Sequence, residues 1–236
     1  MAVIINIETA TAVCSIALGV DGHVKTFKEE MEGRSHSSHL TVFIEEMLKD
    51  TGTRLEEIDA ISVSKGPGSF TGLRIGVSVA KGLCFSLGLP LIAIDTLQSM
   101  AVSGIRNFLN QQNGDKIQDH SQYHFCPMID ARRMEVYSAI YDSNLNEIRG
   151  VEANIVDSTS YSNYLVNNQV VFFGDGMSKC KETLQHQKNA IFLDGVLPSA
   201  TDMVLLSERD FKEGSFQDVA YFEPYYLKDF MPGLKK

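Results

Sequence analysis

The residues from Lys65 to Gly76 form the stretch of this chain best suited to chemistry. They read Lys-Gly-Pro-Gly-Ser-Phe-Thr-Gly-Leu-Arg-Ile-Gly and follow a run typical of a buried strand. Glycines let the chain turn sharply, Ser69 or Thr71 can cap a following helix, and free amides at a helix N-terminus attract anions. The stretch has no P-loop lysine at its end and does not match the dinucleotide fingerprint. An anion-binding loop and a purely structural turn therefore both stay open.

The helix predicted after this stretch, from about Leu73 to Leu87, has small residues at every fourth position. The row consists of Gly72, Gly76, Ala80, Cys84 and Gly88, and large apolar residues fill the other sides. A helix that is apolar all round must be covered all round, by its own sheet and by another helix. We predict that the small residues let a partner helix approach closely. Coverage by helices of the same chain is the alternative.

Histidines and cysteines offer few ligands for a metal. His36 and His39 lie three residues apart at the start of a predicted helix, without a third ligand nearby, so we expect them to be solvated or interfacial. The four cysteines are far apart in sequence and form no C-x-x-C pair. This spacing favours a reducing compartment and thiols packed as small apolar side chains.

Hydrophobic periodicity divides the chain into two similar halves. The first predicts strands at 2–7, 12–20, 24–30, 60–64 and 91–94, with helices at about 36–51, 73–87 and 97–108. The second predicts strands at 123–129, 135–141, 148–156, 170–173 and 190–193, with helices at 158–166, from 177, and at 201–211. The polar segment 111–122 separates lobes 1–110 and 111–236, with the closing segment as a candidate to pack back on the first lobe.

This duplicated βββαβαβα plan defines an α/β protein that resembles the actin, sugar-kinase and heat-shock ATPase superfamily. Active members hold Mg²⁺ through an acid at the turn where Glu8 stands here, and Asp130 occupies the equivalent turn of the second lobe. Gly174-Asp175-Gly176 resembles the turn that packs adenine. The resemblance implies a candidate cleft for ATP or ADP, formed by Glu8, Thr9, Asp130, Gly174 and Gly176. Since Ala131-Arg132-Arg133 replaces the second phosphate loop, retained structural turns are the alternative.

Four segments closely resemble the TsaB family, also called YeaZ. They are the stretch 66–76 already described, Ile7-Glu8-Thr9-Ala10-Thr11, Ile129-Asp130-Ala131-Arg132-Arg133-Met134-Glu135-Val136-Tyr137, and Glu223-Pro224-Tyr225-Tyr226-Leu227. The resemblance implies a cytoplasmic, non-catalytic subunit that binds the related catalytic subunit TsaD, with the ATPase TsaE, to make threonylcarbamoyladenosine in tRNA. It also implies docking through the first two helices. Our predicted partner-binding residues are His36, Leu40, Phe43, Met47, Gly72, Gly76, Ala80 and Cys84.

The same resemblance predicts that the metal chemistry of TsaD is absent. TsaD carries a His-x-x-x-His pair after the strand that here ends near Ile94, and the matching offsets hold Thr96 and Met100. Neither residue is a plausible ligand for iron or zinc. We therefore expect no catalytic residues and no metal site in this chain.

Bulk composition limits the remaining alternatives. The 236 residues are 44% hydrophobic and 22% charged, which suits a folded globular protein. The formal charge of −9 and the lack of an evident basic patch mean that tRNA is met only through a complex. No apolar run near the roughly 18 residues of a membrane span is evident. An ATP-dependent phosphotransferase or ATPase using Glu8 and Asp130, a metalloprotease-like hydrolase, and a homodimer of the isolated chain stay as alternatives.

Overall fold

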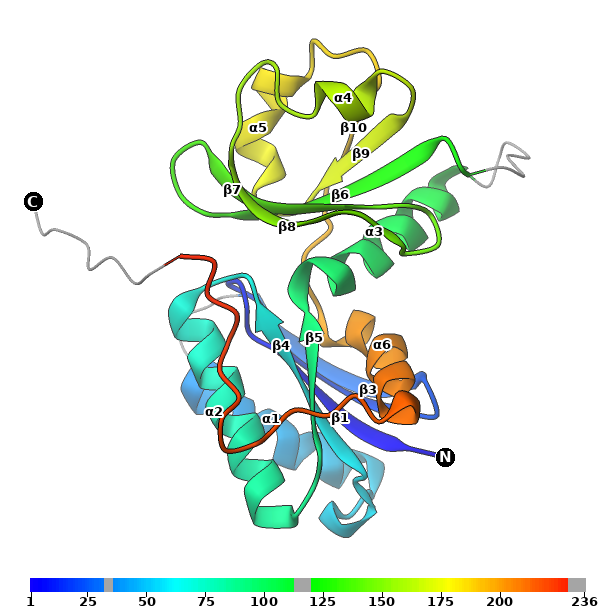
Figure 1. Cartoon of the computed structure of the whole chain (residues 1–236). Helices are drawn as coiled ribbons and strands as arrows, with labels where there is room; N and C mark the ends of the chain where they lie inside the picture. Colours follow the sequence, from blue (N-terminus) through cyan, green and yellow to red (C-terminus); the bar gives the residue numbers. More distant parts are fainter. Residues whose placement is uncertain (32–35, 113–119, 229–236) are drawn as a thin grey trace, which may run out of the picture.

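The computed structural model describes residues 1–31, 36–112 and 120–228, with the backbone alone for residues 36–39. It contains two lobes, each built on one five-stranded sheet (Figure 1). The strands of the first lobe run in the order β3-β2-β1-β4-β5. They are β1 (Val3–Glu8), β2 (Cys14–Val20), β3 (His23–Glu30), β4 (Ala60–Gly66) and β5 (Leu91–Asp95). The helices of this half of the chain are α1 (His36–Thr51), α2 (Phe70–Leu87) and α3 (Thr96–Gln112), with a 3₁₀ turn at Leu55–Glu57.

The second sheet repeats the first. Its order is β10-β9-β6-β7-β8, so β6 pairs antiparallel with β7 and parallel with β9, as β1 does with β2 and β4. The strands are β6 (Tyr123–Asp130), β7 (Glu135–Tyr141), β8 (Glu147–Ile155), β9 (Gln169–Phe173) and β10 (Ala190–Leu193), and the helices are α4 (Ser162–Leu165), α5 (Met177–Leu184) and α6 (Ala200–Glu213). The duplicated plan predicted from sequence is confirmed, and with it the superfamily fold.

The last helices of the two halves differ from the sequence prediction in the lobe that they cover. We expected α6 to complete the second lobe, but its Met203, Val204 and Leu206 form one buried cluster with Ile4 and Ile92 of the first sheet. Helix α3 in turn buries apolar side chains against Phe125 and Phe173 of the second sheet. The chain therefore crosses between the lobes twice (Figure 1). Periodicity shows that each helix has an apolar face, but it does not show which sheet that face meets.

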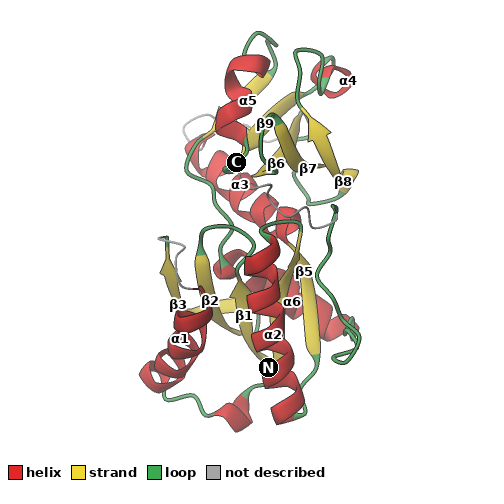
Figure 2. Ribbon diagram, turned by 90° about the vertical axis from the view of Figure 1, so that its left-hand side faces the viewer, coloured by secondary structure: helices red, strands yellow, loops and turns green. Residues whose placement is uncertain are grey.

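Alternating side chains of the first sheet face different helices. Ile5, Ile7 and Val63 belong to the cluster under α1 and α2, whereas Ile4 and Ala17 belong to the cluster under α6. Successive strand residues point to opposite faces, so both faces of this sheet are covered. Helices α1 and α2 lie beside each other over one of these faces (Figure 2).

Helix α2 bears on our sequence prediction about membranes. Within the described residues, this 18-residue helix is long and apolar enough to cross a bilayer, as judged by length and composition. A core helix passes the same test. Six of its residues are buried in the structure: Gly72, Leu73, Gly76, Val77, Ala80 and Cys84. We therefore describe α2 as a packing helix of the first lobe with one open side.

The closing segment, residues 217–228, runs along α2 (Figure 1). Lys81 of α2 donates hydrogen bonds to the carbonyl oxygens of Ala220 and Phe222, at 3.1 and 2.9 Å. The Tyr225 amide donates to the Lys65 carbonyl at 2.7 Å, and the Tyr226 ring packs on Phe70. This segment therefore packs against the first lobe.

Candidate functional site

Glu8, the acid at the position where active members of the superfamily hold Mg²⁺, is buried at the end of β1. Its carboxylate is completely buried, and Oε1 accepts hydrogen bonds from the Ala10 amide at 2.5 Å and from the Ser64 hydroxyl at 2.9 Å. Oε2 has no hydrogen-bond partner among the described residues. Burial raises the pKa of Glu8 from 4.5 to about 7, and the hydrogen bonds only partly oppose this effect. Near neutral pH, a large fraction of Glu8 is therefore protonated.

The glycine-rich stretch before α2 packs against the turn after β1. Ser69 caps α2 by accepting from the Gly72 amide, and its own amide donates to the Ala10 carbonyl at 2.6 Å. A Cβ at Gly68 would lie 2.3 Å from the Ala10 carbonyl oxygen, and one at Gly72 would lie 2.1 Å from that of Thr9. The glycines thus allow the helix to approach the β1–β2 turn closely. The stretch therefore has a packing role at the start of α2.

At the equivalent turn of the second lobe, Asp130 is exposed to solvent and held by hydrogen bonds. It pairs with Lys179 and donates its amide to the Asp175 carboxylate at 3.0 Å. The partial burial of Asp130 acts to raise its pKa. Hydrogen bonds from Lys179 and the Arg132 amide outweigh this effect, so they hold the pKa of Asp130 below its ordinary value.

Gly174 and Gly176 lie against the end of β6. A Cβ at these positions would meet the Met128 carbonyl oxygen at 2.2 Å and the Ile129 carbonyl carbon at 2.8 Å. Their small size therefore serves backbone packing in the second lobe. In the described part of the chain, no hydrogen bond or ion pair joins Glu8 or Thr9 to Asp130, Gly174 or Gly176.

Thr96 and Met100 lie in the first turns of α3 and are both completely buried. Met100 packs near Gly174, since a Cβ added there would lie 2.7 Å from the Met100 methyl carbon. Among the described side chains, no group of three or more His, Cys, Asp or Glu is placed to hold a metal. The side chains of His36 and His39 lie outside the described residues.

The row of small residues, which we predicted to face a partner, lies on the buried side of α2. Gly76, Ala80 and Cys84 are buried on their own lobe, and a Cβ at Gly76 would lie 2.3 Å from Thr9 Oγ1. Leu40 and Met47 of α1 are also completely buried in the same core, whereas Phe43 is half-buried. The buried residues among these hold α1 and α2 on the sheet, whereas Phe43 keeps part of its surface accessible. His36 cannot be placed, because its side chain is not described.

The opposite side of α2 carries the open surface that sequence reasoning missed. The outer stripe of α2, as we name it, consists of Thr71, Ile75, Ser78, Gly82 and Phe85. Phe85 is 85% exposed, and a Cβ at Gly82 would meet nothing within 4 Å. The spacing of four, three, four and three residues places all five on one side of the helix. The sequence signal that could have indicated this surface is the spacing of the small residues Ser78 and Gly82 before the aromatic Phe85.

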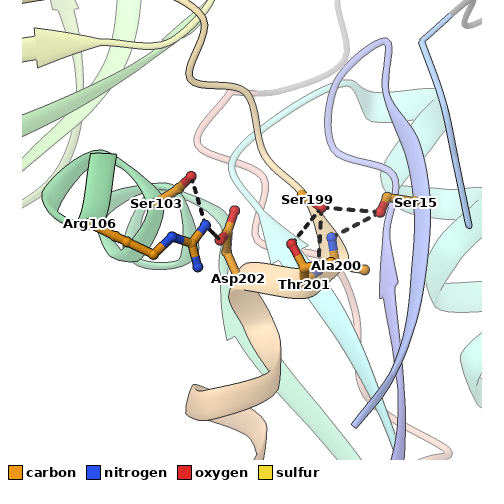
Figure 3. Close-up of polar contacts among 7 residues, drawn as sticks. All are labelled: Ser15, Ser103, Arg106, Ser199, Ala200, Thr201 and Asp202. Atoms are coloured by element: carbon orange, nitrogen blue, oxygen red, sulfur yellow. Dashed lines mark hydrogen bonds and ion pairs between the residues drawn. The ribbon is translucent and has the colours of Figure 1, made fainter. Parts of the chain in front are cut away.

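A polar junction joins α6 to α3 and to strand β2 (Figure 3). Arg106 of α3 pairs with the buried carboxylate of Asp202 on α6 at 2.7 Å. Ser199 caps α6 through the Thr201 amide, and the Ala200 amide donates to the Ser15 hydroxyl of β2 at 3.1 Å. Burial raises the pKa of Asp202, and the Arg106 charge opposes that rise. The long-range contact between Ala200 and Ser15 has no local signal in the sequence.

The duplicated fold defines a member of the actin-like, sugar-kinase-like superfamily in which the start of α2 packs against the turn after β1. The family model described as TsaD, tRNA N6-adenosine threonylcarbamoyltransferase, matches residues 29–230. The TsaB protein of Escherichia coli is 33% identical over 96% of this chain and 94% of its own length, and that of Haemophilus influenzae is 28% identical over 96% and 93%. YeaZ from Pseudomonas aeruginosa superposes with a TM-score of 0.78 at 25% identity, covering 96% of this chain and all of that chain. The chain belongs to the TsaB family of tRNA threonylcarbamoyladenosine biosynthesis proteins.

Proposed function

We propose that this chain is a non-catalytic, cytoplasmic partner subunit that docks on a TsaD-like catalytic subunit, with a TsaE-like ATPase, to form threonylcarbamoyladenosine in tRNA. The observation that carries the proposal is the outer stripe of α2. Phe85 is 85% exposed on a helix whose opposite side is buried in the core. An aromatic anchor surrounded by small residues is the composition of a protein–protein contact.

The geometry of the stripe favours a partner helix. Gly82 and Ser78 lie about one and two turns before Phe85 on the same side of the helix and add little bulk, so a helix of the partner can approach the α2 backbone closely. Phe85 then fills a pocket on that partner, while the half-buried Ile75 extends the apolar contact. The small residues on the buried side of α2 let it lie deep on its own sheet and do not contact the partner.

Features of the two turns support a subunit without its own ATP chemistry. The buried and partly neutral Glu8 is a poor Mg²⁺ partner. Mg²⁺ favours an ionised carboxylate that contacts the cation directly or through one of the waters that the cation holds. The Asp130 charge is already paired with Lys179. Both features argue against the ATPase or phosphotransferase alternative, and against bound ATP or ADP. The described residues also offer no ligand set for the hydrolase alternative.

Calorimetry with the TsaD-like subunit of the same organism tests the docking surface. Phe85→Ala should weaken binding by about 30-fold or more, because a hot-spot truncation costs about 2 kcal/mol. Gly82→Leu should weaken binding by about ten- to a hundredfold, because overpacking costs about 1 to 3 kcal/mol. Phe85→Ala should keep the parent's melting temperature and Gly82→Leu should keep or raise it, since neither position contacts the core and glycine is the poorer helix former. Leu205→Ala, which truncates another exposed apolar residue, 59% exposed on α6, is the matched control.

The isolated chain gives a second readout of the same surface. If it forms a homodimer in sedimentation, the two stripe variants should dissociate that dimer as well. Folded stripe variants that bind the TsaD-like subunit like the parent would show that docking uses another surface.

A further inference from the structure

The hairpin turn between β6 and β7, residues 131–134, differs from its counterpart in the first lobe. The β1–β2 turn is covered by α2, whereas Arg132, Arg133 and Met134 are all exposed. Arg132 and Arg133 both have left-handed backbones, with φ of 71° and 49°. Such hairpin positions favour glycine, asparagine or aspartate, and other residues adopt them at a cost. Two arginines at these positions therefore point to a role for their side chains.

The backbone of this turn is held firmly from below. The Arg132 amide donates to Asp130 Oδ1 at 2.7 Å, and the Glu135 amide donates to the Arg132 carbonyl at 3.1 Å. Asp130 in turn is fixed by its amide bond to Asp175. The two arginine side chains consequently extend from a backbone that is already ordered, which reduces the entropy lost when they bind a ligand.

The local charge is positive although the chain as a whole is acidic. The acids beside the arginines are already paired, Asp130 with Lys179 and Glu135 with Lys228. Within the described residues, neither the Arg132 nor the Arg133 guanidinium forms an ion pair. The formal charge of the whole chain is −9, so the turn is a local basic point on a surface that otherwise repels anions.

We propose that the 131–134 turn binds the phosphodiester backbone of RNA held by the assembled complex. The planar guanidinium groups match phosphate oxygens with paired N–H donors, and a turn of this size reaches the backbone without reading bases. The acidic remainder of the chain prevents binding along the rest of its surface. This inference rests on the proposed function, which supplies the RNA and the second subunit.

The test compares Arg132→Asn/Arg133→Asn with the parent and with Arg54→Asn/Arg209→Asn. Asparagine tolerates the left-handed backbone, so the first pair removes charge without new strain. The second pair removes the same charge from exposed positions elsewhere. Fluorescence anisotropy would follow an unmodified tRNA transcript bound to the chain with its TsaD-like subunit, from about 50 to about 200 mM salt.

The hairpin variant should bind about tenfold more weakly at the lowest salt. Its slope of log affinity against log salt should fall by about 1 to 2, roughly 0.7 to 0.9 for each phosphate that the protein no longer neutralises. The control pair should behave like the parent. A folded hairpin variant with the parent's affinity and slope would overturn the proposal.

Calorimetry of the same variants against the TsaD-like subunit separates this inference from the proposed function. Hairpin variants that lose the protein partner but keep the RNA slope would show that the turn contacts an acidic protein surface, which also overturns the proposal. If the parent chain itself does not bind the TsaD-like subunit, the proposed function fails. The RNA titration is then made with the chain alone from about 20 to about 100 mM salt, and the same difference in affinity and slope between parent and hairpin variant supports or overturns the proposal.

Discussion

Replacing the buried acid Glu8 with glutamine should change how stability depends on pH. The pKa of Glu8 is raised from 4.5 to about 7. The folded state therefore binds more protons than the unfolded state in this window, and the parent loses stability as pH rises from about 4.5 through about 7. Since one pKa unit corresponds to about 1.4 kcal/mol, the parent loses about 3 kcal/mol of folding stability by the upper end of this pH range. The amide introduced by Glu8→Gln would stay neutral, and its carbonyl can still accept from Ala10 and Ser64.

Urea unfolding of parent and Glu8→Gln at several pH values measures this effect directly. The stability of the variant relative to the parent should rise by about 2 to 3 kcal/mol between about pH 5 and about pH 8. Taking the difference cancels the titration of other buried acids, such as Asp95 and Asp175. Glu45→Gln, at an exposed position of α1, is the control and should show a flat difference. A flat difference for Glu8→Gln would refute the claim that Glu8 is buried and protonated.

Two further predictions concern packing and the lobe junction. Gly76→Ala should lower the free energy of unfolding by about 1 to 3 kcal/mol, because its Cβ would lie 2.3 Å from Thr9 Oγ1. Gly82→Ala in the same helix has open space and should add up to about 1 kcal/mol; equal effects of the two changes in denaturant unfolding would contradict the assignment of the two faces of α2. Arg106→Gln should lower the free energy of unfolding by about 1 to 3 kcal/mol. Stability should also fall more steeply as pH rises, because the pKa of Asp202, already raised by burial, rises further without the Arg106 charge. Adding Asp202→Asn should remove that extra pH dependence, and a double-mutant cycle with no coupling would exclude the ion pair.

Local sequence patterns predicted the elements of this fold well. The strands at β7 and β10 have the predicted bounds, and the order of helices and strands is as expected. What local patterns could not supply was the exchange of α3 and α6, because an amphipathic helix packs equally well on any sheet of matching shape. That choice depends on long-range contacts such as Arg106 with Asp202 and Ala200 with Ser15.

The candidate surface shows the same limit more sharply. The row of Gly72, Gly76 and Ala80 correctly signalled close backbone approach, but a β-turn of the same chain fills the space that we assigned to a partner. Phe85 looked like any other core residue in an apolar helix, because sequence alone does not count how many sides of that helix the chain can cover. In the sequence, the arginines at 132 and 133 indicate only an altered phosphate loop, and their exposure and left-handed backbone become evident only in three dimensions.

Reconstitution of tRNA modification tests the central claim most directly. Threonylcarbamoyladenosine would be measured in a tRNA transcript supplied with ATP and an activated threonylcarbamoyl donor, after incubation with this chain, with the TsaD-like and TsaE-like subunits, and with all three together. The account predicts no product from this chain alone, little from the other two without it, and full product from the three together. Product formed by this chain alone, or equal product without it, would contradict the claim that it is a non-catalytic partner subunit.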